Sequence, residues 1–410
     1  MGSRRDWILA LALSVVFGSI GQGHAQEEDL DQLLDMGLEA LMDLEVVTAS
    51  KKPQTVAEAP ANIAVITREM IERRGYRTLE EALRDLPGFD FTTSQPSGEY
   101  PTHFIFRGIT DVGQTKTLMM VDGIVRNDAS NGWFQNVGYA FTLNDVERIE
   151  VISGPGSALY GANAYAGLVH VITRPLNDGQ PGLEAQAKAT FGRHRTLVCP
   201  VPEVLLRYGS ESGFRMQLAG RWYRTNGDGG IGRPDPGRYF HGNFEPDVVL
   251  TTEHGNIPNE RKGDGTRKRL ADGFGTDVDD VCLRGRFQKG SFTLGFTYWD
   301  RTEGLGSEVV GYEYFTNTPG IDYRARHEGY TVFGSHSFGL SETATSRSKL
   351  YVRNTRILPE TGFVYTYKYQ SVANGADPPV TDKVKGYHGE GYVAGLEQQL
   401  DLALSPETSL

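Results

Sequence analysis

The stretch that decides the fold covers residues 146–174 and reads VERIEVISGPGSALYGANAYAGLVHVITR. Two runs rich in β-branched and apolar residues, 149–152 and 168–172, flank a glycine-rich segment. This pattern predicts a strand, a turn with a short helical segment, and a second strand.

The glycines of this stretch suggest two roles, phosphate binding and backbone packing. Leu159 stands where a G-x-G-x-x-G pattern needs its third glycine, and the chain contains no G-x-x-x-x-G-K-[ST] sequence. We therefore predict that Gly154, Gly156 and Gly161 lie where the backbone approaches a neighbour too closely for a side chain.

Outward from this stretch, residues 60–174 predict a compact mixed α/β fold. A short helix should end at Gly75 and a second should begin at Thr78. Asp122 and Gly123 are typical of a tight hairpin turn. The predicted strands are 63–67, 104–106, 118–121, 149–152 and 168–172.

After Pro175 apolar and polar residues alternate with a period of two, which indicates strands with one apolar and one polar face. We predict about eight such strands. They are 183–191, 203–208, 214–223, 281–288, 292–298, 330–338, 346–356 and 396–404.

The connections between these strands are alternately short and long. The long ones, 225–280, 301–327 and 358–389, are polar and rich in glycine or proline. This asymmetry is typical of outer-membrane barrels, although a soluble β-sandwich also alternates. Many charges on the polar faces favour the barrel, as do aromatic residues at strand ends. These are Trp222, Tyr223, Tyr298 and Trp299.

Composition and the N-terminus point to an exported protein. The 410 residues carry a formal net charge of −11, which disfavours a nucleic-acid partner. Arg4 and Arg5, the apolar run 8–20 and a small-x-small site ending at Ala25 predict a signal peptide over residues 1–25. The sequence contains two cysteines, which excludes a disulfide-built scaffold.

Several motifs occur together, in one order, across residues 44–174. The stretch 146–174 is preceded by Met120-Val121-Asp122-Gly123-Ile124, by Phe106-Arg107-Gly108-Ile109 and by the helix end at 79–88. Together they resemble the TonB-dependent outer-membrane receptor family. The resemblance implies an α+β plug domain followed by antiparallel transmembrane β-barrel strands.

The resemblance also implies a domain order. It gives a signal peptide at 1–25, an N-terminal extension at 26–59, a plug domain at 60–176 and the N-terminal part of a barrel at 177–410. Plugged transporters have about 22 strands, and about eight strands hold only side chains. We therefore expect a truncated barrel, of which this chain supplies about eight strands.

One segment of the extension is similar to the part of the family that pairs with the periplasmic protein TonB. A β-prone strand can add to the edge of a partner's sheet through main-chain hydrogen bonds. A plain linker strand is the alternative. The candidate residues are Leu44, Glu45, Val46, Val47 and Thr48.

The resemblance implies that Arg107 helps to lock the plug to barrel carboxylates. The family often has a second arginine where Ser153 stands here, so the lock is expected to be weaker or differently built. Because a buried charge must be paired, Arg107 should have a carboxylate partner.

The predicted ligand contacts are polar or aromatic residues on outward-facing plug loops, where aromatic rings stack on a flat chelate. Packing of these loops against the barrel is the alternative for each residue. The candidates are Tyr100, His103, Asn127, Trp133 and Phe134.

Two further predictions concern a metal site and a disulfide bond. Asp277, Asp279 and Asp280 have a spacing that suits a calcium ion, although solvated loop charge is the preferred explanation. Cys199 and Cys282 are candidates for a loop disulfide. No cofactor is expected, and the chain lacks the H-E-x-x-H, G-x-S-x-G and C-x-x-C motifs of the enzymes considered.

The function implied by the resemblance is active import across the bacterial outer membrane, with a ferric siderophore as the expected ligand. The expected partners are TonB with the inner-membrane proton-motive-force complex, outer-membrane lipid and an extracellular iron chelate. Import of cobalamin or another bulky solute is an alternative. So is a non-transporting surface receptor for phage, colicin or adhesion.

Overall fold

The computed structural model describes the chain from residue 42 to residue 409 with gaps. The described residues are 42–48, 54–92, 103–108, 116–129, 132–134, 136, 138–176, 182–194, 197–225, 250–252, 255–257, 278–304, 322–341, 343–359, 361–367, 381–386, 388–405 and 408–409. The predicted signal peptide lies outside them.

The first of two structural units, here called the α/β unit, is built on a five-stranded mixed sheet. Its strand order is β3-β8-β9-β6-β7, with β6 and β9 parallel and the other neighbours antiparallel. The four predicted strands of this sheet are therefore confirmed. The strands are β3 (Ile63–Thr67), β6 (Thr117–Val121), β7 (Ile124–Val125), β8 (Val146–Ser153) and β9 (Gly167–Thr173).

Short helices flank this sheet where the sequence predicted them. Helix α3 (Arg68–Arg74) ends at Gly75 with a φ of 67°. Helix α4 (Leu79–Arg84) begins at Thr78, whose hydroxyl accepts a hydrogen bond from the Glu81 amide. The remaining short elements are α5 (Ser157–Tyr160), the 3-10 turn η2 (Gly138–Ala140) and the hairpin of β4 (Phe89–Thr92) with β5 (His103–Phe106).

Apolar side chains from both kinds of element form the core of the α/β unit. Leu79 and Leu83 of α4 and Val169 of β9 are fully buried in one cluster that also contains Ile149 of β8. This burial explains why α4 forms although it is only six residues long, because a helix this short gains its stability from tertiary packing.

The prediction of close packing at Gly154, Gly156 and Gly161 is wrong. A Cβ atom at Gly156 would meet Ala164 at an ordinary 3.6 Å, and one at Gly154 or Gly161 would meet no heavy atom within 4 Å. Their φ angles are 132° and 77°, a backbone conformation that disfavours any residue with a side chain. These two glycines are needed for the turn geometry rather than for space.

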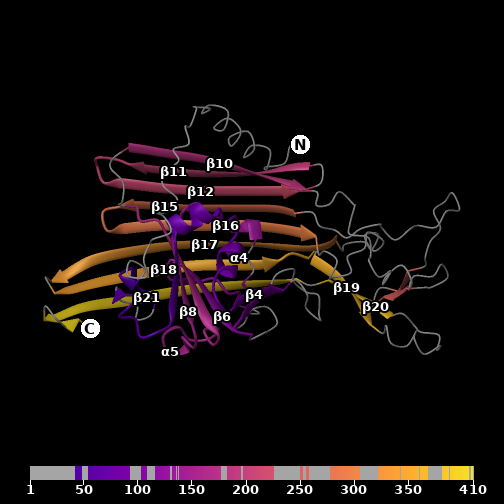
Figure 1. Cartoon of the computed structure of the whole chain (residues 1–410), viewed down its shortest axis with the longest axis horizontal. Coiled ribbons are helices and arrows are strands. Elements are labelled where there is room, and N and C mark those ends of the chain that lie inside the picture. Colours follow the sequence, from indigo (N-terminus) through magenta and orange to yellow (C-terminus); the bar gives the residue numbers. More distant parts are fainter. Residues whose placement is uncertain are drawn as a thin grey trace.

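The second unit, here called the large sheet, consists of long antiparallel strands that follow one another in sequence order (Figure 1). All eight predicted strands are present, and each is longer than predicted. They are β10 (Gly182–His194), β11 (Leu197–Gly209), β12 (Phe214–Thr225), β15 (Val278–Lys289), β16 (Phe292–Gly304), β17 (Asp322–Ser341), β18 (Ala344–Ile357) and β21 (Gly389–Ser405).

Short strands that the sequence did not predict occur within two of the long connections and near the C-terminus. They form small ladders beside the main path of the large sheet. They are β13 (Leu250–Thr252), β14 (Gly255–Ile257), β19 (Thr361–Tyr367), β20 (Thr381–Gly386) and β22 (Thr408–Ser409). Within the described residues β10 pairs only with β11, so the large sheet is open along that edge.

The two faces of the large sheet differ in chemistry. One face exposes apolar side chains such as Leu294, Val332 and Leu396. The opposite face carries buried arginines, among them Arg221 and Arg284. The alternation predicted from the sequence is therefore confirmed, and the α/β unit lies against the arginine-bearing face (Figure 1).

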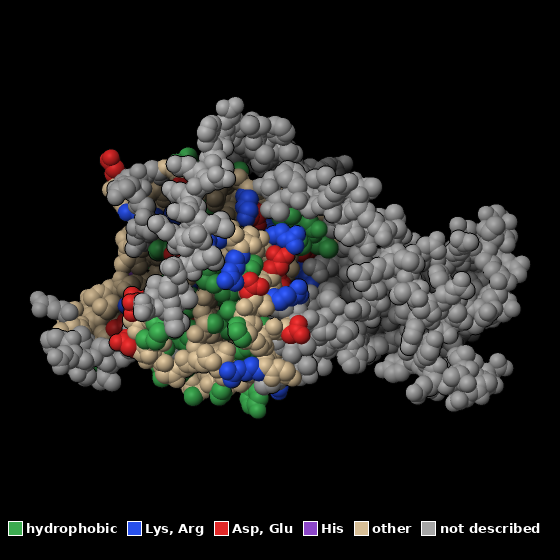
Figure 2. All heavy atoms as spheres, viewed as in Figure 1, with side chains coloured by type: hydrophobic (Ala, Val, Ile, Leu, Met, Phe, Trp, Pro, Cys, Tyr) green, Lys and Arg blue, Asp and Glu red, His purple; other side chains and the backbone are tan. Residues whose placement is uncertain are grey.

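Charged side chains also cover the exposed surface of the α/β unit, where Figure 2 shows basic and acidic groups side by side. Four ion pairs lie on or beside α3 and α4: Arg68–Glu72, Arg73–Glu69, Arg74–Asp85 and Arg77–Glu81. None of the helices among the described residues has the length and apolar character needed to cross a membrane.

Candidate functional site at the interface of the two units

The large sheet contacts the α/β unit mainly through basic side chains that donate to main-chain carbonyl groups. Arg221 donates to the carbonyl oxygens of Phe141, at 3.1 Å, and Arg77. Arg353 donates in the same way to Asn127. Arginine has five N–H donors and no acceptor, so buried arginines suit backbone carbonyls as well as carboxylates.

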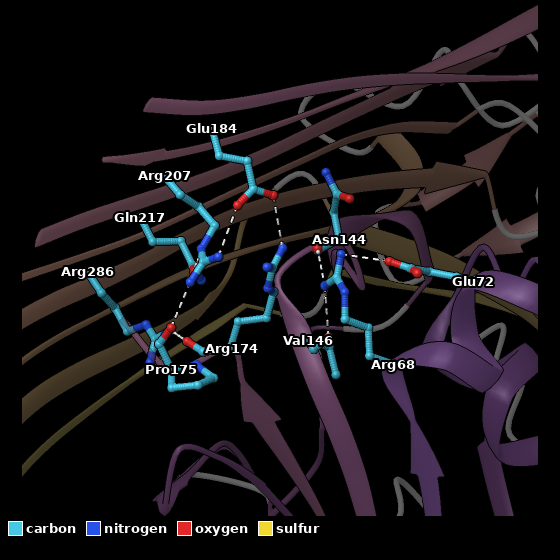
Figure 3. Close-up of polar contacts among 10 residues, drawn as sticks. All are labelled: Arg68, Glu72, Asn144, Val146, Arg174, Pro175, Glu184, Arg207, Gln217 and Arg286. Atoms are coloured by element: carbon cyan, nitrogen blue, oxygen red, sulfur yellow. Dashed lines mark hydrogen bonds and ion pairs between the residues drawn. The ribbon is translucent and has the colours of Figure 1, made fainter. Parts of the chain in front are cut away.

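The covalent junction between the two units is held by a cluster of the same kind (Figure 3). Arg207 donates to the Pro175 carbonyl at 2.8 Å and to the Glu184 carboxylate at 3.0 Å. Glu184 also accepts from Arg174 at 3.3 Å, and Arg286 donates to the Arg174 carbonyl. The exit of the chain from the α/β unit is therefore fixed to β10, β11 and β15.

A buried ion pair also crosses the interface. Arg284 of β15 lies 2.6 Å from Asp145, and the two side chains are 3% and 2% exposed. The Arg284 guanidinium also stacks over the Phe141 ring, 5.0 Å from its centre. Here the carboxylate belongs to the α/β unit and the arginine to the large sheet, the reverse of the lock predicted for Arg107.

The Arg107 side chain is exposed in the part of the chain that the structure describes, so the burial predicted for it is wrong there. It has a φ of 51°, and its amide donates to the Gly88 carbonyl at 2.7 Å. Because the side chain remains in contact with solvent, its charge does not require the carboxylate partner that burial would demand. Its role in a lock stays a prediction.

Segment 44–48 is packed onto the α/β unit. Strand β1 (Glu45–Val46) pairs with β2 (Gln54–Thr55), and Val46 and Thr48 are 0% and 1% exposed. The Glu150 carboxylate of β8 accepts hydrogen bonds from the Val47 amide at 3.1 Å and the Thr48 amide at 2.9 Å.

Further contacts involve every remaining polar atom of Thr48. Its hydroxyl bonds both to Glu150 and to Nδ1 of His170, the latter at 3.0 Å. Its carbonyl accepts from the Tyr160 hydroxyl at 2.7 Å. Burial is the main cause that raises the pKa of Tyr160 to about 12, so the phenol stays protonated and available to donate.

The structure contradicts the outward position predicted for three of the five candidate ligand contacts. Asn127, Trp133 and Phe134 are 3%, 8% and 4% exposed. The Asn127 amide group bonds to the Met119 amide and to the Thr117 and Gly132 carbonyls, so it clamps its own loop. Phe134 belongs to the core and meets Phe141 edge-on. The side chains of Asn127 and Phe134 therefore pack within the α/β unit itself, whereas the alternative considered above was packing against the barrel.

The other two candidate ligand contacts are less fully described. Tyr100 lies outside the described residues, and for His103 the structure describes only its backbone in β5. Their predicted role in ligand binding is neither supported nor opposed.

The calcium candidate does not form as a group. Asp279 and Asp280 are successive residues of β15, so their side chains point to opposite faces of the sheet. Asp279 accepts a hydrogen bond from the Trp222 indole at 3.0 Å, and Asp280 accepts one from the Thr302 amide. Asp277 lies outside the described residues.

The predicted disulfide is contradicted, because Cys282 is a free, buried thiol. Cys282 lies opposite Arg221 of β12, which lies opposite Glu203 of β11, four residues from Cys199. The two cysteines are thus separated by two strand spacings, ~10 Å, and ~13 Å along the strand. A disulfide needs Cα atoms within about 7 Å.

Sequence reasoning missed Glu150 and His170, which hold segment 44–48, and the Asp145–Arg284 pair. A signal was present in each case. Glu150 and His170 interrupt the otherwise apolar runs 149–152 and 168–172, and Arg284 lies on the polar face of an alternating strand. Their partners could not be found from the sequence, since 102 residues separate Thr48 from Glu150.

Comparison with known proteins agrees with this architecture. Residues 55–168 match the family described as TonB-dependent Receptor Plug Domain. The chain is 30% identical over 227 residues to the vitamin B12 transporter BtuB of Vibrio vulnificus, covering 54% of this chain and 32% of that protein. It is 40% identical over 134 residues to an iron-regulated outer membrane virulence protein of Vibrio cholerae, covering 32% of this chain and 20% of that protein.

A solved structure shares the fold. FpvA of P. aeruginosa, bound to heterologous pyoverdines, superposes with a TM-score of 0.57 at 15% identity, covering 89% of this chain and 43% of that chain. The chain spans about a third or less of the length of the two Vibrio relatives.

A compact α/β unit lies on the polar face of a long-stranded antiparallel sheet, and the FpvA structure shares this fold. Residues 55–168 form a TonB-dependent receptor plug domain, and the relatives to which the chain is similar are an outer-membrane protein and a vitamin B12 transporter. The α/β unit is called the plug below. The family consists of receptors and transporters rather than enzymes.

Proposed function

We propose that this protein takes part in active import across the outer membrane, driven by TonB acting on segment 44–48. The observation that carries the proposal is the docking of this segment on the plug by Glu150 and His170. A segment that is held on the plug by hydrogen bonds to side chains can be released without unfolding the plug sheet.

The position of the segment supports this role. His170 bonds to the amide of Gly123, and Lys349 of β18 donates to the carbonyl of Asp122 at 2.8 Å. Lys349 lies five residues from Ala344, where a short turn begins β18. Outer-membrane barrels present their short turns to the periplasm, so segment 44–48 would face the compartment in which TonB acts.

The strands of the large sheet are long enough for a transmembrane position. Each of the eight has 12 to 20 residues, and about 9–11 residues of tilted strand cross a bilayer. The apolar side chains of their exposed face would meet lipid, and the buried arginines would face the lumen and the plug.

For the ligand we propose a ferric siderophore, because the similar protein of Vibrio cholerae is described as iron-regulated. Cobalamin is the second candidate, favoured by the likeness to the vitamin B12 transporter of Vibrio vulnificus. Growth rescue of a strain that depends on this receptor, with a panel of iron chelates and with cobalamin as sole cobalt source, separates the two.

The transport mechanism is tested by deleting residues 44–48 from the chromosomal gene. We expect uptake of the rescuing ligand to fall to background while ligand binding at the cell surface is retained. Replacement of Thr55 by Val, in the neighbouring strand β2, is the matched control and should leave uptake unchanged. Uptake that survives the deletion would overturn the transport proposal and favour a surface receptor without transport.

A further inference from the structure

Glu150 is a carboxylate between two apolar neighbours, Ile149 and Val151, and its burial is complete, with 0% of the residue exposed. One of its oxygens accepts from the amides of Val47 and Thr48 and from the Thr48 hydroxyl. The other oxygen accepts from Arg148 Nε at 2.8 Å. The carboxylate is therefore neutralised by one cation of its own strand and uses its second oxygen entirely for segment 44–48.

The neighbouring His170 lies directly opposite Glu150 in the antiparallel pair of β8 and β9. Its Nε2 lies 2.9 Å from the amide nitrogen of Gly123. Because a backbone N–H can only donate, Nε2 must accept and the ring proton must sit on Nδ1. Nδ1–H then donates to the Thr48 hydroxyl, which leaves the hydroxyl proton free to donate to Glu150. The four groups form one chain of hydrogen bonds with a single direction.

This chain of hydrogen bonds continues into the large sheet. Gly123 and Asp122 form the turn between β6 and β7, and both have positive φ angles, 78° and 48°. Lys349 of β18 donates to the Asp122 carbonyl, and its Nζ would lie 3.1 Å from a Cβ atom at Gly123. The Gly123 amide determines which nitrogen of His170 carries the proton. The turn that orients this amide is in contact with Lys349, a side chain of the large sheet.

We propose that Thr48, Glu150 and His170 form a docking latch for segment 44–48, and that Lys349 keeps the latch closed by positioning the Asp122–Gly123 turn. When the turn moves away from Lys349, the hydrogen bond from the Gly123 amide to Nε2 of His170 is lost. The ring proton is then no longer held on Nδ1, where it is donated to the Thr48 hydroxyl. A movement of the barrel wall is then sensed at segment 44–48 without any direct contact between the two. The biological use of the latch rests on the proposed function, whereas its existence does not.

The latch is tested with a nitroxide spin label at the exposed position Glu45→Cys, in the whole chain in outer-membrane vesicles without TonB or ligand. Cys199 and Cys282 are replaced by alanine so that the label is unique. The ratio of the mobile to the immobile component of the label's spectrum measures the ratio of the released to the docked form of the segment. We expect Thr48→Val, Glu150→Gln and His170→Phe each to raise this ratio about tenfold or more, since each removes hydrogen bonds to or beside a buried charge.

Coupling to the barrel has its own variant and its own control. Lys349→Met should raise the ratio about twofold or more although Lys349 does not touch the segment. Lys349 also lies 3.8 Å from Glu397, so Glu397→Gln removes that ion pair and keeps the Asp122 contact. Glu397→Gln and Glu147→Gln in β8 should leave the ratio unchanged.

The possible results separate the parts of the proposal. A label that is already mobile in the parent chain, or an unchanged ratio in Thr48→Val, would overturn the latch. Thr48→Val leaves the plug itself unaltered, so the test stands even where Glu150→Gln fails to fold. An unchanged ratio in Lys349→Met beside a raised ratio in Thr48→Val would overturn the coupling to the barrel. None of these results depends on uptake, so the transport proposal is judged separately by the deletion of residues 44–48.

Discussion

At the scale of single residues, the interface between plug and barrel depends on where buried charges find partners. Most of the barrel cations described above bind plug carbonyl groups, which carry no titratable proton. Arg284 is the exception among these cations. It forms an ion pair with the Asp145 carboxylate of the plug, and this pair is almost completely excluded from solvent. Removing one member of such a pair leaves an uncompensated charge, which costs far more than the pair contributes.

We therefore predict that Asp145→Asn destabilises the seating of the plug by roughly 3–5 kcal/mol. The measurement is the urea midpoint at which plug residues become sensitive to protease in detergent-solubilised protein. Glu147→Gln, which removes a nearby carboxylate, is the control. The double replacement Asp145→Leu with Arg284→Met should recover much of the loss, and a double variant as weak as Asp145→Asn would contradict the charge explanation.

His170 gives a second prediction at this scale, on pH. Burial lowers the pKa of His170 to about 4 against the opposing effects of Glu150 and Asp122, while Lys349 and Arg148 act in the same direction as burial. The docked state therefore favours the neutral ring. A released, solvated ring has an ordinary pKa near ~6.5, so docking is strongest above that pH and weakens as the pH falls toward about 4.

The spin-label ratio at position 45 should accordingly be constant between about pH 7 and pH 8 and rise in favour of the released segment below about pH 6. His170→Phe should abolish this dependence on the histidine. A ratio that stays level down to pH 4.5 in the parent chain would show that the ring does not sense the docked state.

At the scale of elements, the fit between β9 and the β4–β5 hairpin depends on one glycine. A Cβ atom at Gly167 would lie 2.1 Å from the Phe106 ring and 2.7 Å from the Ile152 carbonyl oxygen. The Phe106 ring cannot move aside, because it is buried in the core cluster. The carbonyl belongs to the backbone of the neighbouring strand β8. Neither contact can be relieved without moving backbone.

Gly167→Ala should therefore destabilise the plug by about 1–3 kcal/mol or more, as overpacking does in other cores. Gly156→Ala is the matched control, because its Cβ atom would meet Ala164 at an ordinary 3.6 Å. Its cost should stay below about 1 kcal/mol. Thermal unfolding of the plug in detergent measures both, and equal costs would contradict the packing argument.

At this scale the sequence predicted most of the elements. The period-two alternation located all eight long strands, because one side of each strand is apolar and the other carries polar groups toward the plug. It missed β4 and β7, which have four and two residues and no alternation long enough to detect. It also placed β19 and β20 in a loop, since glycine and proline residues are scattered through the connection 358–389.

At the scale of the whole molecule, the short turns and long connections give the barrel an orientation. Ser212 lies exposed in the turn between β11 and β12. We predict that a membrane-impermeant maleimide labels Ser212→Cys, in the same cysteine-free background, only after the outer membrane has been permeabilised. An epitope tag placed between residues 225 and 278 should instead be detected on intact cells. Labelling of both sites from the same side would contradict the orientation.

The sequence by itself determined the family, the order of the elements and the two-faced character of the long strands. These properties depend on local patterns, on turn residues and on motifs that lie close together in the chain. Only the tertiary structure decided which charges meet. Arg284 pairs with Asp145 across 139 residues, and Glu150 meets Thr48 across 102. The physical reason is that the free energy of a buried charge depends on the partner nearest to it. The way the plug packs on the sheet determines which residue that partner is. The same packing brings Glu150 and His170 of the stretch 146–174 into contact with segment 44–48.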